Sequence, residues 1–107
     1  MASSIEYVQY VCEQIRGTGD IRFRKMFGDY MVYVNDKPIF LVCEDTVYVK
    51  ILPELAPLLE KAERGMPYTG AKEHSILDID DAALSCAVAR ILEQITPLPR
   101  PRKKRTK

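Results

Sequence analysis

The sequence predicts an α+β fold: an antiparallel sheet of four to five strands, connected as a meander, with N- and C-terminal helices packed on one face and the element order α-β-β-β-β-α-β-α. Apolar residues recur at helical spacing near both ends of the chain, whereas its middle holds short runs rich in β-branched and aromatic residues. Turns of about two residues separate these runs, and connections this short join antiparallel strands.

The first and last elements are predicted to be helices. The first spans residues 4–16 and ends at Gly17, while the last begins at Asp80 or Asp81, where the helix dipole favours carboxylates, and ends before Pro97. Their apolar faces consist of Ile5, Val8, Cys12 and Ile15 in the first helix and Leu84, Val88, Ile91, Leu92 and Ile95 in the last.

Four strands are predicted between these helices, at residues 21–27, 30–34, 38–43 and 46–51, with pairs of turn-forming residues between them. Ile51 is expected to share a face with the valines of the fourth strand. The side chains expected to supply much of the core are Phe27, Val32, Val34, Ile39, Leu41, Val47 and Val49.

The segment before the last helix is less regular. Residues 52–65 indicate a short helix that is irregular at Pro57 and ends at Gly65. A loop follows, and residues 75–79 are the candidate for one further short strand.

The opposite face of the sheet is expected to be partly apolar, which would indicate a protein partner or a homodimer. Val32 and Val34 are candidates for this face as well as for the core. The side chains assigned to it are Tyr30, Val32, Val34, Thr46, Tyr48 and Lys50.

The chain is predicted to form one domain, residues 1–96, followed by a Pro-, Lys- and Arg-rich disordered tail, residues 97–107. Residues 1–99 carry ten basic and fifteen acidic side chains, a net charge of −5, whereas residues 100–107 carry six basic and no acidic ones. Such a tail is a candidate for sequence-independent contact with nucleic acid. Its candidate residues are Arg100, Arg102, Lys103, Lys104, Arg105 and Lys107.

One series of residues in the strands resembles a known family. The series is Arg24, Met26, Phe27, Gly28, Tyr30, Tyr33, Phe40, Leu41, Tyr48 and Lys50. It is similar to the R-x-M-F-G…Y…Y…F-(A/L)…(L/V)-Y-(L/V)-K pattern of the TfoX/Sxy N-terminal domain. A later "GMPYTG" and the closing amphipathic helix are similar to that family's layout too, so the resemblance covers roughly residues 5–96.

The resemblance implies a regulatory or protein-interaction domain linked to competence or transcriptional regulation. The family is named for bacterial competence regulators, in which this domain precedes a second helical domain. Because the chain ends eleven residues after Thr96, it resembles a stand-alone first domain. Stand-alone members are typically of unknown function.

No constellation of residues indicates catalysis, a cofactor, a metal ion or a small-molecule substrate. His74 is the single histidine and lies beside Glu73, without a second metal ligand at helical spacing. Cys12, Cys43 and Cys86 are odd in number and far apart, so neither a disulfide framework nor a zinc site is indicated.

No apolar run approaches the ~20 residues of a membrane span and no signal peptide is evident, so a cytoplasmic protein without membrane contact is expected.

A cluster of basic residues precedes the first turn of the predicted sheet. Arg22 and Arg24 share strand parity, and Lys25 points to the opposite face. They are candidates either for contact with an acidic partner or for charges that discourage edge pairing. The residues considered for partner binding are Arg22, Arg24, Lys25, Tyr30, Tyr48 and Lys50.

Three classes of function follow. We expect a non-catalytic regulatory or protein-interaction domain that uses the sheet or its edge. The alternative is an accessory nucleic-acid binder that acts through the basic tail. A small enzyme that uses His74 ranks last.

Overall fold

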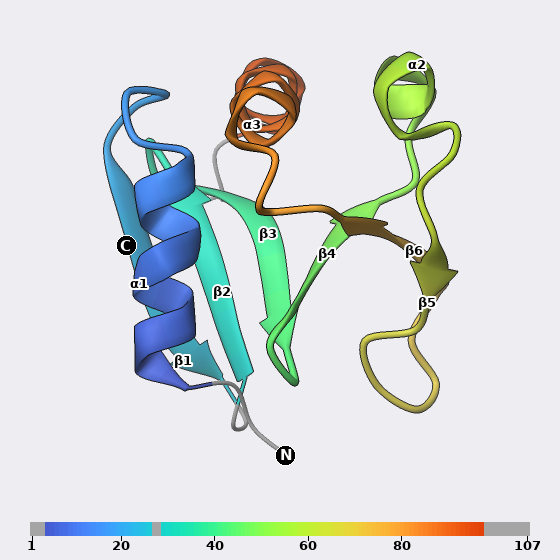
Figure 1. Ribbon diagram of the computed structural model, residues 1–107, viewed down its shortest axis with the longest axis horizontal. Helices are drawn as coiled ribbons and strands as arrows, with labels where there is room; N and C mark the ends of the chain where they lie inside the picture. Colours follow the sequence, from blue (N-terminus) through green and yellow to red (C-terminus); the bar gives the residue numbers. More distant parts are fainter. Residues whose placement is uncertain (1–3, 27–28, 98–107) are drawn as a thin grey trace, which may run out of the picture.

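The computed structural model describes residues 4–26 and 29–97 and confirms the α+β class (Figure 1). Three helices, a 3-10 turn and six strands follow one another along the chain. Their bounds are α1 Ile5–Gln14, β1 Ile21–Met26, β2 Asp29–Val34, β3 Lys37–Cys43, β4 Thr46–Lys50, η1 Pro53–Leu55, α2 Ala56–Leu59, β5 Arg64–Gly65, β6 His74–Leu77 and α3 Ala82–Ile95.

All strands belong to one antiparallel sheet with the order β1-β2-β3-β4-β6-β5. The first four form the predicted meander. In Figure 1, α1 lies over β1 and β2, α3 lies over the middle of the sheet, and α2 lies toward its far end. The helices of residues 4–26 and 29–97 cover one face only, so the other face has no helical layer from this part of the chain.

Two hairpin turns fix the register of the meander. Asn35 and Asp36 have φ values of 52° and 66°, and Glu44 and Asp45 have φ values of 50° and 53°. Two consecutive left-handed residues define the tight turn whose twist matches that of the flanking strands, and short polar side chains tolerate this conformation best. Local sequence therefore determines where these strands reverse.

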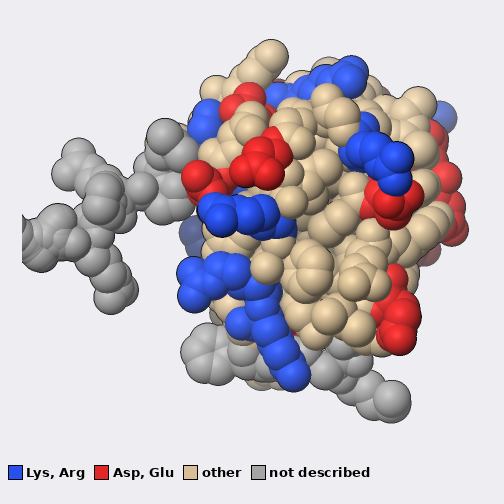
Figure 2. Space-filling view, turned by 90° about the vertical axis from the view of Figure 1, so that its left-hand side faces the viewer, with Lys and Arg blue, Asp and Glu red and all other residues tan. Residues whose placement is uncertain are grey.

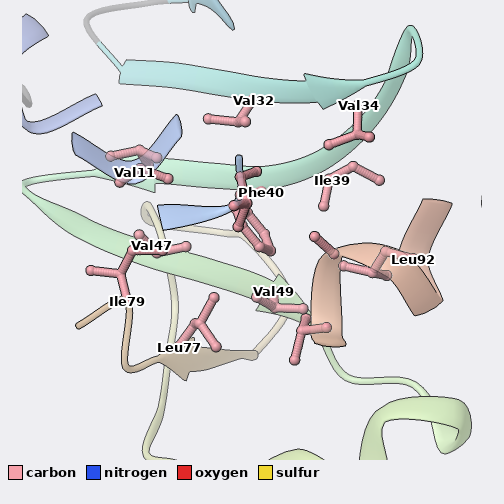
Figure 3. Close-up of a cluster of buried hydrophobic side chains, with 14 of the residues drawn as sticks. Val11, Val32, Val34, Ile39, Phe40, Val47, Val49, Leu77, Ile79 and Leu92 are labelled. Carbon is pink, nitrogen blue, oxygen red and sulfur yellow. The ribbon is translucent and has the colours of Figure 1, made fainter. Parts of the chain in front are cut away.

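The core lies between the helices and the covered face of the sheet (Figure 3). Phe40 of β3 is fully buried at its centre, and valines from the neighbouring strands surround it. The helical segments bury one side each: Val8, Val11 and the C-cap residue Ile15 from the first, and Val88, Ala89 and Leu92 from the last. Val11 and Ala89 are not among the expected residues. Ile5 and Ile95, which are expected on these faces, lie at the helix ends and are 47% and 37% exposed.

A shift in register between β2 and β3 changes which residues of β3 enter the core. The pairing slips between Val32 and Tyr33, so that Ile39 and Phe40 are both buried although they are adjacent. Leu41 then points to the uncovered face and is half-buried. The expectation that Leu41 lies in the core is wrong, because a bulge adds one residue to the alternation. Phe27, another expected core residue, lies outside the described residues.

The predicted composition of the second face needs correction. Tyr30, Val32 and Val34 are buried on the helix-covered side, whereas Tyr48 is paired with Leu41 on the other side. β3 lies between β2 and β4 and contains the bulge. The bulge shifts the in–out alternation by one residue, so Tyr30 of β2 and Tyr48 of β4 lie on opposite faces. The uncovered face therefore receives Met31 and Tyr33 from β2 instead.

The segment after β4 also departs from expectation. The single helix expected over residues 52–65 is a 3-10 turn followed by α2, which ends at Leu59, and Gly65 lies in β5 instead of ending a helix. Ile51 lies beyond the end of β4 and is 41% exposed, so it does not share the face of Val47 and Val49. The candidate strand at residues 75–79 is present as β6.

A polar contact joins the β2–β3 turn to the last helix. The Nζ of Lys37 donates a hydrogen bond of 2.7 Å to the carbonyl oxygen of Glu93 and lies 3.3 Å from its carboxylate. The side-chain amide of Asn35 donates to the same carboxylate at 3.3 Å. These contacts tie α3 to the sheet on the polar side of the core.

The contact predicts an acid dependence of stability. Hydrogen bonds from Asn35 and then Lys37 hold the pKa of Glu93 below its ordinary value of 4.5. A carboxylate with a lowered pKa stabilises the fold above its unfolded pKa, and this contribution is lost as the pH falls through the folded pKa. We expect Glu93→Gln to lower the free energy of unfolding at pH 7, and we expect the difference to shrink as the pH falls below 4.5 and through the lowered pKa of Glu93 in the folded state.

Urea unfolding at a series of pH values measures this dependence. Glu60→Gln, an exposed carboxylate beyond α2, is the matched control and should follow the wild type throughout. Wild-type and Glu93→Gln curves that run parallel from pH 7 to pH 3 would contradict the assignment.

Candidate interaction site on the uncovered sheet face

A row of side chains crosses the uncovered face from strand to strand. The registers pair Arg24 with Met31, Met31 with Leu41, Leu41 with Tyr48, and Tyr48 with Ile76. We call Met31, Leu41, Tyr48 and Ile76 the apolar row. Directly opposed residues in antiparallel strands have Cβ atoms about 5 Å apart, so these side chains form one continuous surface. Each is half-buried.

Shorter rows flank the apolar row on both sides. On one side Arg22 pairs with Tyr33, and Tyr33 pairs with Pro38. On that same side Lys50 pairs with His74 and His74 with Gly65. On the other side Met26 pairs with Asp29 and Cys43 with Thr46. The apolar row is thus bordered by polar and charged groups.

Tyr48 is the central packing residue of this face. Its Cε1 lies 3.6 Å from the position that a Cβ would take at Gly65, and the Cδ1 of Ile76 lies 3.4 Å from the same point. The rings of Tyr48 and His74 meet edge to face with centroids 6.4 Å apart. An aromatic ring that covers a glycine of an edge strand shields the backbone there, which explains how the two-residue strand β5 is held in the sheet.

Basic side chains lie at the β1 end and on one flank of the apolar row, and Asp29 lies on its other flank. Arg22 is paired with Asp36 across the first hairpin. Arg24 and Lys50 are exposed and form no ion pair within residues 4–26 and 29–97. Because residues 1–99 carry a net charge of −5, a border of unpaired cations sets this face apart from the rest of the domain.

Two of the residues considered for partner binding do not lie on this face. Tyr30 is 7% exposed on the helix-covered side, where its ring meets that of Phe23 edge to face at 5.7 Å. Lys25 is exposed but pairs with Tyr30, so it has the opposite parity to Arg22 and Arg24, as the sequence predicted. The structure brings Arg22, Arg24, Tyr48 and Lys50 together on one face.

Among the described residues, none is arranged around His74 for acid–base catalysis. Its Nδ1 lies 2.7 Å from the carbonyl oxygen of Lys72, so this nitrogen is the donor. Glu73, its neighbour in sequence, lies 3.8 Å from Arg64 instead. Edge-to-face contact with Tyr48 gives the imidazole a packing role in the sheet.

The cysteine beside the apolar row is not activated. Cys43 is 2% exposed. Burial, and secondarily a hydrogen bond with Asp29, raises the pKa of its thiol to about 12. A nucleophilic cysteine requires a lowered pKa, so this thiol stays protonated and inert at neutral pH.

Other sites of chemistry are not evident in the described part of the chain. No group of three or more His, Cys, Asp or Glu residues there is placed to hold a metal ion. A search of the same residues finds no helix with the length and apolar character needed to cross a bilayer. The candidate nucleic-acid residues of the tail, Arg100 to Lys107, lie outside the described residues.

Sequence reasoning missed three of the four members of the apolar row. Met31 and Leu41 were hidden by the bulge, which reverses the parity of β3 relative to β2. Ile76 lies in a four-residue strand that is too short for its alternation to be recognised. Only Tyr48 could be assigned to the uncovered face from the sequence, because the alternation of Val47, Tyr48 and Val49 is unambiguous within one strand.

Comparison with known proteins identifies relatives of the chain. The family model of the TfoX N-terminal domain matches residues 13–89. A protein of Spirochaeta aurantia, described as an uncharacterized 12.7 kDa protein in the trpE 5′ region, is 30% identical over 109 residues, which span 100% of this chain and 95% of the relative. No solved structure gives a significant match.

The packing of Tyr48 predicts its contribution to stability. Tyr48→Ala removes two direct cross-strand pairs and uncovers Gly65, so we expect the free energy of unfolding to fall by about 1–2 kcal/mol. Tyr48→Phe keeps the ring and should change it by less than about 0.5 kcal/mol. Urea unfolding measures both, with Tyr68→Ala as the control because Tyr68 is 60% exposed in the β5–β6 loop. Equal effects of Tyr48→Ala and Tyr68→Ala would contradict the packing role.

Proposed function

The chain belongs to the TfoX N-terminal domain family, and from this premise we propose that it is a non-catalytic regulatory domain that binds a protein partner through the uncovered face of its sheet. The observation that carries the proposal is the apolar row. Four half-buried side chains form a continuous stripe over four strands on a face that no helix covers. Contiguous apolar surface with a polar border is typical of protein interaction sites.

The partner is inferred from charge. An exposed border that contains Arg24 and Lys50 complements a protein whose apolar contact surface is bordered by acidic side chains. A second copy is a poorer occupant, because two such faces stacked together place cations of the same sign around one interface, on bodies that repel each other. The proposal therefore commits to a different protein.

Absence of an activated group supports a binding role over a catalytic one. Cys43 is held protonated, and His74 has neither a nucleophile nor an orienting carboxylate beside it. Within the described residues, the uncovered face thus offers a surface for binding and no activated group for catalysis. Membership of the family suggests competence or transcriptional regulation in the cytoplasm as the process in which the partner acts.

Replacement of Leu41, the middle of the apolar row, tests this function. Leu41→Lys places a charge where the partner's apolar surface would lie, and we expect affinity for the partner to fall at least about tenfold, or 1.4 kcal/mol. The matched control is Leu58→Lys, since Leu58 is 37% exposed on α2, away from this face. Proteins captured from the cells that express the chain would be identified, purified and titrated calorimetrically against the wild type and both variants.

Three outcomes separate the alternatives. Loss with Leu41→Lys and retention with Leu58→Lys support the proposal. Equal affinity for both variants contradicts it. A wild-type dimer in light scattering that Leu41→Lys converts to a monomer would assign the face to a second copy and overturn the choice of a different protein.

A second candidate function rests on the composition of the tail. Six basic residues within residues 100–107 suffice to contact several phosphates without reading sequence. If all six do so on duplex DNA, the logarithm of affinity should fall with the logarithm of salt concentration with a slope of about −5. Fluorescence anisotropy on labelled DNA measures it, with the full chain compared with a variant in which these six residues are Gln. Unchanged binding in the Gln variant would exclude the tail.

A further inference from the structure

Strand β1 has a free edge. It is the terminal strand of the sheet and pairs with β2 on one side, while no other strand of the described part of the chain pairs with its outer side. The opposite terminal strand, β5, has only two residues. With six residues, β1 therefore offers the longer open edge.

The pairing of β1 with β2 shows which of its backbone groups face outward. The amide of Asn35 donates a 2.8 Å hydrogen bond to the carbonyl of Asp20, so the next pair, Ile21 with Val34, is a non-hydrogen-bonded pair. Because the two kinds of pair alternate, Phe23 and Lys25 have the same character. The N–H and C=O groups of Ile21, Phe23 and Lys25 thus point away from β2.

The helix-covered side of this edge opens into a groove beside α1. The groove has a volume of about 1060 Å³. Its apolar floor comes from Ile21 and Phe23 of β1 and from Tyr10 and Cys12 of α1. Both β1 residues are half-buried, so a side chain set beside them would gain apolar contact.

The other side of the edge is basic. Arg22 and Arg24 are exposed there, and Arg24 forms no ion pair within the described residues. Figure 2 looks onto the side of the molecule where α1 and β1 lie, and it shows basic side chains grouped beside a broad uncharged area. From Ile21 to Arg24, apolar residues on one side therefore alternate with arginines on the other, and Lys25 follows on the apolar side.

We propose that β1 accepts an added strand from a partner protein, and that the strand is one in which apolar and acidic side chains alternate. Hydrogen bonds to the outward groups of Ile21, Phe23 and Lys25 would hold its backbone. Residues opposite each other across antiparallel strands share a face, so its apolar side chains enter the groove and its carboxylates meet Arg22 and Arg24. This second binding surface shares Arg24 with the border of the apolar row, but its backbone and apolar contacts do not involve that row.

The same alternation argues against a second copy at this edge. Two β1 strands side by side would match their apolar sides but would bring arginines of both copies together, and like charges directly opposite destabilise a strand pair. Charged edge residues are also a common guard against aggregation. Edge charges that are all positive disfavour pairing with a basic strand or with β1 of a second copy, and they favour pairing with an acidic strand.

A labelled octapeptide of alternating Val and Glu is the probe. Anisotropy gives its affinity for the full chain, and amide hydrogen exchange by NMR reports where it binds. In the free chain we expect the amides of Ile21, Phe23 and Lys25 to exchange faster than those of Arg22 and Arg24, and we expect the peptide to protect them. A peptide of the same composition in the order Val-Val-Glu-Glu should bind at least tenfold more weakly.

Variants with matched charge changes locate the contact. Arg24→Glu should weaken the alternating peptide at least tenfold, whereas Lys61→Glu, on the exposed surface beyond α2, should leave its affinity within twofold. Leu41→Lys should also leave it within twofold, which separates this surface from the apolar row. The proposal is overturned if the alternating peptide does not bind at 1 mM, a concentration chosen to reveal weak binding of about −4 kcal/mol, or if both charge variants weaken it equally. Protection of amides elsewhere, with those of β1 unchanged, would also overturn it.

Discussion

The structure depends on one constraint: a six-stranded sheet has two faces, and the helices cover only one of them. Because strand side chains alternate, each inward residue that packs against the helices implies an outward neighbour without a helical layer above it. Phe40 and the valines around it fill the covered side. On the other side the cross-strand pairs from Met31 to Ile76 shield the sheet by contact with one another.

The bulge in β3 is what gives the uncovered face its character. Without it, β3 would keep the parity that its sequence suggests and Leu41 would point toward the helices. With it, Ile39 and Phe40 both enter the core, and Leu41 joins Met31 to Tyr48 in the apolar row. The extra residue of the bulge thus adds one buried side chain to the core and also places Leu41 in the apolar row.

Much of the fold follows from local sequence. The helical spacing of Val8 and Val88 and the turn chemistry of Asn35 and Asp36 determine the helices and the first reversal, because these signals act within a few residues. The bulge and β5 could not be predicted in this way. The bulge is a property of the pairing of two strands, and Arg64 with Gly65 is too short to show a period. The bulge also explains why the sequence put Tyr30 on the wrong face while it placed Tyr48 on the uncovered face correctly.

The uncovered face and the β1 edge combine apolar contact with exposed cations, of which Arg24 and Lys50 have no ion pair within the described residues, although residues 1–99 are net acidic. The proposed partners of both surfaces are therefore acidic, partly apolar proteins, and neither surface holds an activated catalytic group within the described residues. These features support the proposal that the domain acts by contact with a partner. Regulation through a bound partner is consistent with such a domain, and the partner's own charges would decide how quickly the two associate.

Oxidative footprinting of the chain, alone and with its captured partner, tests this account most directly. It labels exposed Met and Tyr side chains and so compares the uncovered face with the β5–β6 loop, where Met66 and Tyr68 are 61% and 60% exposed. The account predicts that labelling of Met31, Tyr33 and Tyr48 falls in the complex while that of Met66 and Tyr68 is unchanged. Protection of Met66 and Tyr68, with the uncovered face labelled as before, would contradict it.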